Sequence, residues 1–276
     1  MELNKDEQLL KKYEELKELL SGYGSLAVAF SGGVDSTFLL YAAKEALGEK
    51  VMAVTGLSGS FPGREIREAD EYCKSLGIPQ AHVKVEEMQI PGFKENGKDR
   101  CYYCKKEIFT GLMEEAKKAG MKEIAEGSNQ DDLSDYRPGM RAIRELGVKS
   151  PLQELQFSKR EIRALSKILK LPTWDKPSFA CLATRFPYGD EITAEKLRMV
   201  DLGEQFLMDQ GFRQIRVRIH GRIARIECLP EDISRFTQEE GLREKICRAF
   251  KEYGFSYVAL DLMGYRMGSM NEVLEK

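Results

Sequence analysis

One short stretch, residues 31–36, constrains the fold of this chain most, and it reads Ser-Gly-Gly-Val-Asp-Ser. An apolar run precedes it at residues 26–30, and an apolar segment with helical spacing follows at residues 37–43. This order predicts a strand, a glycine turn and a helix. Glycines let the backbone approach a ligand closely, and the first amides of a helix bind anions. The stretch therefore predicts a phosphate site; the alternative is a junction whose glycines serve only the turn.

Residues 31–36 also resemble the SGGxDS signature of the PP-loop ATP pyrophosphatases, and they lack the Gly-Lys-Ser/Thr ending of the Walker loop. The resemblance implies that ATP binds here with Mg²⁺ and is cleaved between its α and β phosphates. It implies that Asp35 is catalytic and acts through Mg²⁺. The residues that would hold the pyrophosphate are Ser31, Gly32, Gly33, Val34, Asp35 and Ser36.

Three further predicted strands, at residues 51–55, 81–85 and 122–126, alternate with helical patterns. This alternation predicts a parallel sheet in an α/β domain. Toward the C-terminus, a helix, two alternating segments joined by a His-Gly-Arg turn, a second helix and a last strand predict a small α+β unit. We therefore expect an α/β PP-loop (adenine nucleotide alpha hydrolase-like) domain over residues 1–189. A small α+β domain over residues 190–276 would bind the substrate phosphate or mediate oligomerisation.

The composition is that of a soluble globular protein, with 42% hydrophobic and 32% charged residues. No apolar run approaches the length of a membrane span, and the amino terminus lacks a signal-peptide core. The formal net charge of −2 gives no global electrostatic attraction to nucleic acid, although local basic patches remain open. We expect a cytoplasmic protein that acts on a small molecule and has neither a membrane nor a nucleic-acid partner.

Two of the expected strands are followed by polar loops, which should lie side by side at the carboxyl edge of a parallel sheet. In PP-loop proteins the first of these segments borders the adenine and the ribose, so the resemblance implies that Leu57 and Ser58 are candidate nucleotide contacts. The second would face the same site, where Gly127 and Gln130 are candidate contacts to the ribose or base. Carboxylates in the acidic loop at residues 127–139 could also hold Mg²⁺. The alternative is a solvated loop that only connects elements.

Three cysteines form a candidate metal or redox constellation. Cys101 and Cys104 open an expected helix, and Cys181 lies in an irregular, proline-rich segment that we interpret as an active-site loop. Structural zinc requires four ligands, and the only histidines of the chain are His82 and His220. Three thiolates can hold a [4Fe-4S] cluster that leaves one iron open to sulfide. The alternatives are a thioredoxin-like dithiol and a merely buried Cys181.

The other three cysteines, Cys73, Cys228 and Cys247, fall on apolar patterns, and we expect them in the core.

Arginines alternate along the first strand of the expected C-terminal hairpin. Arg216 and Arg218 are two residues apart and therefore share one strand face, and guanidinium groups bind phosphate bidentately. Arg216 and Arg218 therefore predict a phosphate site; the alternative is that they lie on a solvated face of the sheet.

Over nearly its whole length the sequence resembles the LarE family, the ATP-dependent pyridinium-3,5-biscarboxylic acid mononucleotide sulfurtransferases. The resemblance rests on residues 31–36, 126–139 and 181–189 and on Arg216-Val217-Arg218. It implies nickel-pincer nucleotide biosynthesis for lactate racemase maturation. Each carboxylate of the pyridinium mononucleotide would be adenylated, with release of pyrophosphate and then AMP, as sulfur replaces oxygen.

The family uses two sulfur sources. In some members the cysteine equivalent to Cys181 gives up its own sulfur and becomes dehydroalanine, whereas in others three cysteines hold a [4Fe-4S] cluster that accepts sulfide from a donor. This chain has Cys101, Cys104 and Cys181, so the resemblance implies the cluster type with these three cysteines as catalytic ligands. The sacrificial route stays open.

The resemblance also assigns residues in the C-terminal part. Arg216 and Arg218 would bind the substrate phosphate, Glu204 and Glu227 would bind a further metal, and the oligomer would be a hexamer. Two other activities remain open: a PP-loop tRNA thiolase and a non-catalytic module that binds adenine nucleotides. An amidotransferase-type synthetase would leave the three thiols without a role.

Overall fold

The computed structural model describes residues 5–134, 138–177 and 180–272. Of the segments discussed above, residues 135–137 of the acidic loop and residues 178–179 before Cys181 lie outside these described ranges. Among the described helices, none combines the length and the apolar character needed to cross a membrane.

The chain forms two compact units whose segments alternate along the sequence. The first unit comprises Met1–Ser58, Gly63–Glu86 and Cys101–Phe179, and the second comprises Gly59–Pro62, Glu87–Arg100 and Ala180–Lys276. The boundary expected at residue 189 lies inside the second unit, and a division into domains at that residue stays a prediction.

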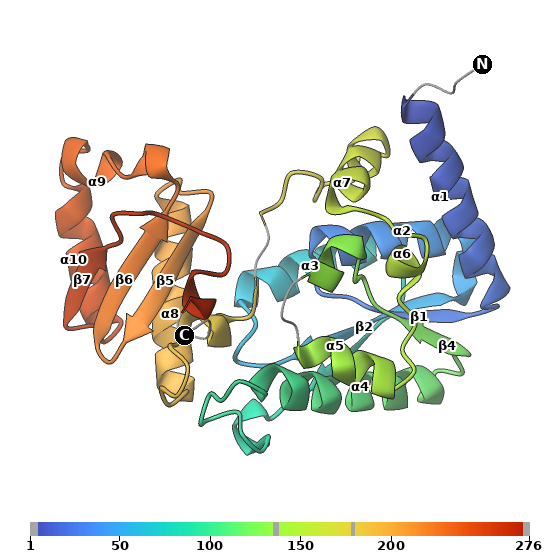
Figure 1. Cartoon of the computed structure of the whole chain (residues 1–276), viewed down its shortest axis with the longest axis horizontal. Coiled ribbons are helices and arrows are strands. Elements are labelled where there is room, and N and C mark those ends of the chain that lie inside the picture. The colour runs from blue at the N-terminus through green and yellow to red at the C-terminus, as the bar shows by residue number, and fades with distance from the viewer. Residues whose placement is uncertain (1–4, 135–137, 178–179, 273–276) are drawn as a thin grey trace. The chain divides into compact units, whose positions relative to one another are not determined.

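The first unit is built on a parallel sheet with the strand order β3-β2-β1-β4 (Figure 1). The strands are β1 (Leu26–Ala29), β2 (Val51–Leu57), β3 (Gln80–Lys84) and β4 (Glu123–Ala125). All of β1 except its last residue, and most of β2, is buried, as expected for strands that helices cover on both faces. The expected α/β fold with a parallel sheet is confirmed.

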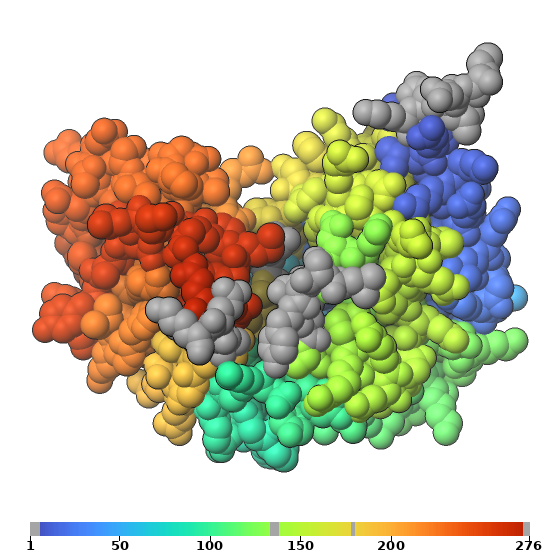
Figure 2. All heavy atoms as spheres, viewed as in Figure 1, coloured from blue at the N-terminus to red at the C-terminus, as the bar shows by residue number. Residues whose placement is uncertain are grey.

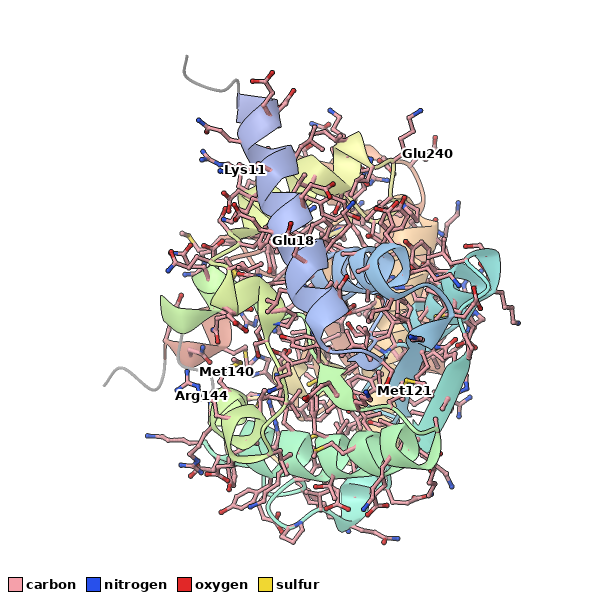
Figure 3. The ribbon with its side chains drawn as sticks, turned by 90° about the vertical axis from the view of Figure 1, so that its right-hand side faces the viewer. Lys11, Glu18, Met121, Met140, Arg144 and Glu240 are labelled. Atoms are coloured by element: carbon pink, nitrogen blue, oxygen red, sulfur yellow. The ribbon has the colours of Figure 1, made fainter. Side chains whose placement is uncertain are left out.

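Helices cover both faces of this sheet. In Figure 1, α1, α2 and α7 lie on one face, and α4 and α5 lie on the other. Leu16 and Leu20 of α1 are buried in the core with Phe38 of α2, whereas Lys11 and Glu18 project from the exposed side of α1 (Figure 3). The helices are α1 (Lys5–Gly22), α2 (Val34–Leu47), α3 (Gly63–Ser75), α4 (Arg100–Lys118), α5 (Pro138–Glu145), α6 (Pro151–Glu154) and α7 (Lys159–Ile168).

The strand order creates one point at which ligands are expected. β1 and β4 are neighbours although the chain forms β2 and β3 between them. The chain leaves β1 through α2 toward β2 and reaches β4 from β3 through α4, and α2 and α4 cover opposite faces of the sheet (Figure 1). Open α/β sheets bind ligands at the carboxyl ends of their strands where the strand order reverses. Residues 31–36 follow β1 at this point, and the acidic loop follows β4.

The second unit contains a smaller sheet with the strand order β5-β6-β7. Its elements are α8 (Ala194–Asp209), β5 (Ile215–His220), β6 (Ile223–Cys228), α9 (Arg235–Gln238), α10 (Leu242–Glu252) and β7 (Tyr257–Leu260). β5 and β6 form the expected antiparallel hairpin, and Gly221 turns it with φ of 60°. The segment after β7, red in Figure 1 and in Figure 2, crosses in front of the strands in Figure 1, and its Tyr265 amide donates to the Cys228 carbonyl at the end of β6 (2.7 Å).

The three cysteines expected in the core have different environments. Cys73 and Cys228 are buried, and burial raises the pKa of Cys73 to about 12 and that of Cys228 to about 11. Cys247 is exposed, so its assignment to the core was wrong. The buried face of α10 is formed by other residues at helical spacing, and Cys247 does not lie on it. The buried residues are Leu242, Ile246, Ala249 and Phe250.

Candidate active site

The glycine turn between β1 and α2 has the backbone geometry of a ligand-binding turn. Gly32 has φ of 70°, and a Cβ at this position would lie 3.2 Å from the Glu65 carbonyl oxygen. Gly33 is the extended N-cap of α2. The hydroxyl groups of Ser31 and Ser36 lie 3.2 Å apart, and Ser36 donates to the Gly33 carbonyl (3.2 Å). The strand, turn and helix expected from the sequence are confirmed, with two serine hydroxyls gathered at the helix start.

Asp35 on the first turn of α2 already has a cationic partner. Its carboxylate forms an ion pair with the Lys159 ammonium group and accepts a hydrogen bond from the Asn129 side chain (3.4 Å). Lys159 and Asp35 are partly exposed, at 27% and 23%. Our sequence analysis missed Lys159 and Asn129.

The position of Lys159 is set by the start of α7. Ser158 is the N-cap of this helix, and its hydroxyl group and the Glu161 carboxylate form a capping box. The Lys159 amide donates to the Asp131 carboxylate (2.9 Å) on the short 3₁₀ helix η3 (Gln130–Ser134) that follows β4. The Ser-Lys-x-Glu pattern predicts a helix start, and only the fold brings that start to Asp35.

Of the predicted adenine and ribose contacts, Gly127 lies against the start of α2. A Cβ on Gly127 would lie 2.9 Å from the Ser36 amide nitrogen, so only glycine fits without displacement. Leu57 and Ser58 stand at the carboxyl end of β2, beside β1. Gln130 is exposed, and its amide donates to the Phe157 carbonyl (2.9 Å). Nucleotide binding by these residues stays a prediction.

A second lysine that the sequence analysis missed contacts the glycine turn. The Lys176 ammonium group donates to the Gly32 carbonyl (3.0 Å) and pairs with Glu65 (2.7 Å) and Glu68 (2.6 Å) on α3. Lys176 therefore joins the segment after α7 to both the turn and α3, and it holds the turn in place.

Cys101 and Cys104 lie on the first turn of α4, three residues apart and therefore on one helix face. Neither is in a disulfide, and both are partly exposed. Cys181 is likewise not in a disulfide and is partly exposed, but it belongs to the second unit, where it precedes the 3₁₀ helix η4 (Leu182–Arg185). Among the described residues, no group of three or more cysteine, histidine or acidic side chains is placed to hold a metal. A three-thiol site stays a prediction, with which the partial exposure of all three cysteines agrees.

The chain around Cys181 is held by residues just before α4. Arg100 is buried and donates to the Ala183 carbonyl (2.8 Å), two residues after Cys181. Asn96 is fully buried at φ of 51°; it accepts from Arg100 and donates to the Pro187 carbonyl (2.6 Å). All these contacts lie within the second unit, and Arg100 directly precedes Cys101 in the sequence.

Arg216 and Arg218 are buried, at 3% and 5% exposure, so a solvated sheet face was the wrong alternative. Arg218 donates to the Glu227 carboxylate (2.7 and 3.0 Å) and to the Thr184 carbonyl (3.1 Å). The Arg216 guanidinium lies over the Tyr265 ring, 5.0 Å from its centroid. Burial and the positive charge of Arg185 lower the pKa of Arg216 to about 10. This strand face therefore concentrates positive charge.

Glu204 and Glu227 are engaged by guanidinium groups. Both oxygens of Glu204 accept from Arg185 (2.7 and 2.9 Å). In Glu227, one oxygen accepts from Arg218, and the other lies 3.3 Å from the Arg225 guanidinium. As arranged, neither carboxylate fits a divalent cation, because a metal would have to displace an arginine. Metal binding by these two residues stays a prediction, and we assign no chemistry to it.

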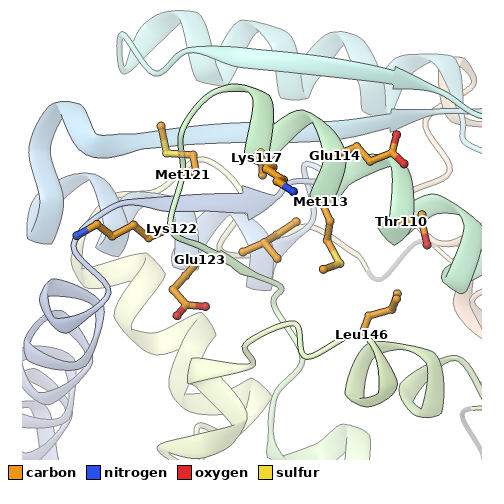
Figure 4. Close-up of a pocket in the computed structure, with 10 residues that line it drawn as sticks. Thr110, Met113, Glu114, Lys117, Met121, Lys122, Glu123 and Leu146 are labelled. Carbon is orange, nitrogen blue, oxygen red and sulfur yellow. The ribbon is translucent and has the colours of Figure 1, made fainter.

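The first unit also has an open hollow of about 400 Å³ beside α4 (Figure 4). Met113 and Lys117 of α4, Glu123 and Ile124 of β4, and Leu146 contribute to its lining. Glu123 is the first residue of β4, so this hollow lies at the amino end of the strand. Parallel sheets bind ligands at the opposite end, and the hollow is not the candidate nucleotide site.

Comparisons with known proteins agree with this geometry. Residues 25–96 match the family model described as queuosine biosynthesis protein QueC. An uncharacterized protein of Synechocystis sp. is 43% identical over 97% of this chain and 100% of that protein. An uncharacterized protein of Methanocaldococcus jannaschii is 31% identical over 94% of this chain and 97% of that protein.

A third relative carries a functional name. The pyridinium-3,5-bisthiocarboxylic acid mononucleotide synthase of Lactiplantibacillus plantarum is 36% identical over 97% of this chain and 96% of that protein. This similarity confirms the family resemblance stated from the sequence, and it agrees with an ATP-dependent enzyme built on a PP-loop. The chain belongs to the LarE family of pyridinium-3,5-bisthiocarboxylic acid mononucleotide synthases, within the PP-loop ATP pyrophosphatases.

Proposed function

We propose that this protein transfers sulfur, with consumption of ATP, to pyridinium-3,5-biscarboxylic acid mononucleotide, the precursor of a nickel-pincer cofactor. The observation that carries the proposal is the 36% identity, over nearly the full length of both chains, to the synthase from Lactiplantibacillus plantarum. The glycine turn after β1 and the buried arginines of β5 supply sites for the two phosphate-bearing molecules that this reaction requires.

In the activation step, the substrate carboxylate attacks the α phosphate of ATP, and the bond to the leaving pyrophosphate breaks. The serine hydroxyls and helix amides of residues 31–36 bind the pyrophosphate by hydrogen bonding. Asp35 is the residue that would hold Mg²⁺, which neutralises phosphate charge when bound. The ion pair with Asp35 supports a phosphate-binding role for Lys159, because its ammonium group already lies at the helix start.

Arg216 and Arg218 bind the substrate phosphate in this proposal. Arg185, Arg216, Arg218 and Arg225 lie around Glu204, Glu227 and Asp261. These seven groups sum to one excess positive charge when all are ionised. An anion would relieve that excess, which agrees with the lowered pKa of Arg216.

In the second step, sulfur attacks the acyl carbon and AMP leaves with the oxygen that linked it to that carbon. Cys101, Cys104 and Cys181 would hold a [4Fe-4S] cluster, whose open iron would supply sulfide from a donor. The contact between Arg100 and the Ala183 carbonyl supports joint action of the two cysteine segments, because Arg100 precedes Cys101 and Ala183 follows Cys181 closely in sequence. The competing source is the sulfur of Cys181 itself.

Anaerobic purification tests the sulfur source. The cluster route predicts a brown protein with iron and acid-labile sulfide, and Cys101→Ala should remove both. Cys247→Ala, which changes another free cysteine, is the matched control and should leave both unchanged. A colourless reconstituted protein in which Cys181 loses the elements of H₂S during turnover would establish the sacrificial route instead.

Formation of the thiocarboxylate from ATP and the pyridinium mononucleotide tests the reaction itself. No pyrophosphate release with this substrate would contradict it. Tight, salt-dependent tRNA binding would point to a tRNA thiolase. The hexamer implied by the family resemblance stays a prediction, which size-exclusion chromatography with light scattering tests.

A further inference from the structure

Arg185, four residues after Cys181, is the largest fully buried side chain among the described residues. Its ion-pair partner, Glu204 on α8, is 3% exposed at the side chain. Burying two charges carries a large desolvation penalty, and a buried pair is often no more stable than apolar side chains of the same volume. A contribution to stability is therefore a weak explanation for the buried Arg185–Glu204 pair. The other contacts of Arg185 indicate a different role.

The guanidinium divides its donors between Glu204 and the Cys181 segment. Nε and Nη2 donate to the two Glu204 oxygens (2.7 and 2.9 Å). Nη1 donates to the carbonyls of Ala180 (3.0 Å) and Cys181 (3.3 Å) and to the Thr184 hydroxyl (2.8 Å). One rigid, planar group therefore bridges α8 and the backbone of the cysteine.

The backbone of Cys181 has further restraints. Its carbonyl accepts from the Thr184 amide (3.0 Å) and the Thr184 hydroxyl (2.9 Å). The next amide, that of Leu182, donates to the Ser60 carbonyl (2.8 Å). Three donors thus converge on the carbonyl of Cys181, a residue that is itself partly exposed.

Glu204 links this segment to the strand of arginines. Its Oε1 atom also accepts from the Val217 amide (3.0 Å), and Val217 lies between Arg216 and Arg218 on β5. Arg185, Glu204 and Val217 all belong to the second unit. A continuous chain of hydrogen bonds therefore runs from the Cys181 carbonyl to the backbone of the strand proposed to bind the substrate phosphate.

We propose that Arg185, anchored by Glu204, is a positioning residue that holds the Cys181 thiol at a fixed place relative to Arg216 and Arg218. This inference rests on the proposed function for the role of Cys181 and of the arginines. The geometry assigns Glu204 to positioning through Arg185. A small displacement of a reacting group can reduce a rate by about 100-fold, so such a support would matter to sulfur transfer.

The decisive variant is the double substitution R185M/E204L. It removes both charges and the bonds to Ala180 and Cys181, and apolar replacement of a buried ion pair commonly preserves folding. We expect thermal unfolding close to the parent. In peptide-resolved mass spectrometry of the full-length protein, Cys181 should react several-fold faster with iodoacetamide. Exposed Cys247 serves as the internal reference and should react at its parental rate.

Amide hydrogen exchange and kinetics provide independent readouts. Residues 181–185 should exchange faster in R185M/E204L. The turnover number for sulfur transfer should fall about 100-fold while the KM for ATP stays unchanged, because the residues assigned to ATP lie in the first unit. R235M/E239Q is the matched control, since it removes another Arg–Glu pair of the second unit that contacts neither Cys181 nor β5 in the described bonds.

R185K decides the question if the double variant does not fold. Lysine keeps the charge opposite Glu204 but cannot reach Glu204, Ala180 and Thr184 together, so Cys181 should again alkylate faster. Unchanged alkylation and exchange in a folded variant would overturn the positioning role. Cys181→Ala separates this inference from the proposed function: if it keeps full activity, the role of Cys181 fails, whereas alkylation in R185K still tests the positioning.

Discussion

The two units hold their site charges in opposite ways. In the first unit, the Asp35–Lys159 pair is about a quarter exposed, and both residues stand where a nucleotide phosphate is proposed to bind. In the second unit, the Arg185–Glu204 pair is 0% and 3% exposed, and Arg218–Glu227 is 6% and 1% exposed. A solvent-exposed ion pair can exchange partners at little cost in free energy. Separating a buried ion pair costs much more, because it leaves a charge that neither water nor a partner compensates. The Asp35–Lys159 pair of the first unit can thus be redirected to a ligand, whereas the Arg185–Glu204 pair of the second unit serves as an internal support.

The largest expected effect comes from breaking the buried scaffold on one side only. Arg185→Met leaves the Glu204 carboxylate buried without its main cation, and we expect a loss of about 3–5 kcal/mol in the free energy of unfolding. Urea denaturation measures this loss. The double variant R185M/E204L should recover most of it. If Arg185→Met is as stable as the parent, the proposed difference between the exposed ion pair of the first unit and the buried ion pair of the second is wrong.

Lys159→Met should have the opposite effect, with little change in stability and a large loss of activity. Removal of a partly exposed pair should change the free energy of unfolding by no more than about 1 kcal/mol. Loss of one preorganised cation beside a leaving phosphate should slow pyrophosphate release about 100-fold. Lys167→Met, in the last turn of the same helix, is the control and should retain the parental rate. A strongly destabilised but active Lys159 variant would refute the assignment.

Gly32→Ala tests whether the first site depends on backbone shape. The new Cβ meets the Glu65 carbonyl at 3.2 Å with φ of 70°, and we expect a loss of about 2 kcal/mol together with weaker ATP binding. Gly120→Ala provides the comparison, because Gly120 also has positive φ, at 75°, but has no atom within 4 Å of the added Cβ. The difference in unfolding free energy between the two variants isolates the close contact, and calorimetry with ATP measures binding.

The smallest expected effect is a loss of stability at low pH, caused by protonation of Glu204. Burial alone would raise the pKa of Glu204, but the charge and hydrogen bonds of Arg185 outweigh it and hold that pKa below its ordinary value of 4.5. A lowered carboxylate pKa gives stability that is present above 4.5 and is lost as pH falls through the lowered value. The parent should therefore lose stability relative to R185M/E204L on acidification, which urea denaturation at a series of pH values measures. If the free energy of unfolding changes with pH in the same way in both proteins, Arg185 and Glu204 are not an ionised pair in the parent.

Much of the local structure is predictable because its causes lie close together in sequence. The apolar run, two glycines and apolar helix around residues 31–36 specify a strand, a turn and a helix, which the structure confirms. The hairpin of β5 and β6 follows from alternation on both sides of Gly221. Cys247 shows the limit of such reasoning, because a residue at the edge of an apolar helix stripe can face either way.

The site was less predictable, since its contacts join distant segments. Asp35 and Lys159 are 124 residues apart, and nothing in a Ser-Lys-x-Glu helix start indicates which carboxylate its lysine meets. The alternation of Arg216 and Arg218 predicts a shared face but leaves open whether water or protein covers it. The segment after β7, with Tyr265 and Ser269, covers it here.

The sequence by itself determined the parallel α/β fold, the glycine turn and the family, because apolar periodicity, turn chemistry and motif spacing act over short distances along the chain. Only the tertiary structure decided which charges are paired and which are buried. The pairing of Asp35 with Lys159 and of Arg185 with Glu204 depends on the packing of whole elements. Desolvation then makes the second pair a fixed support and leaves the first open to exchange.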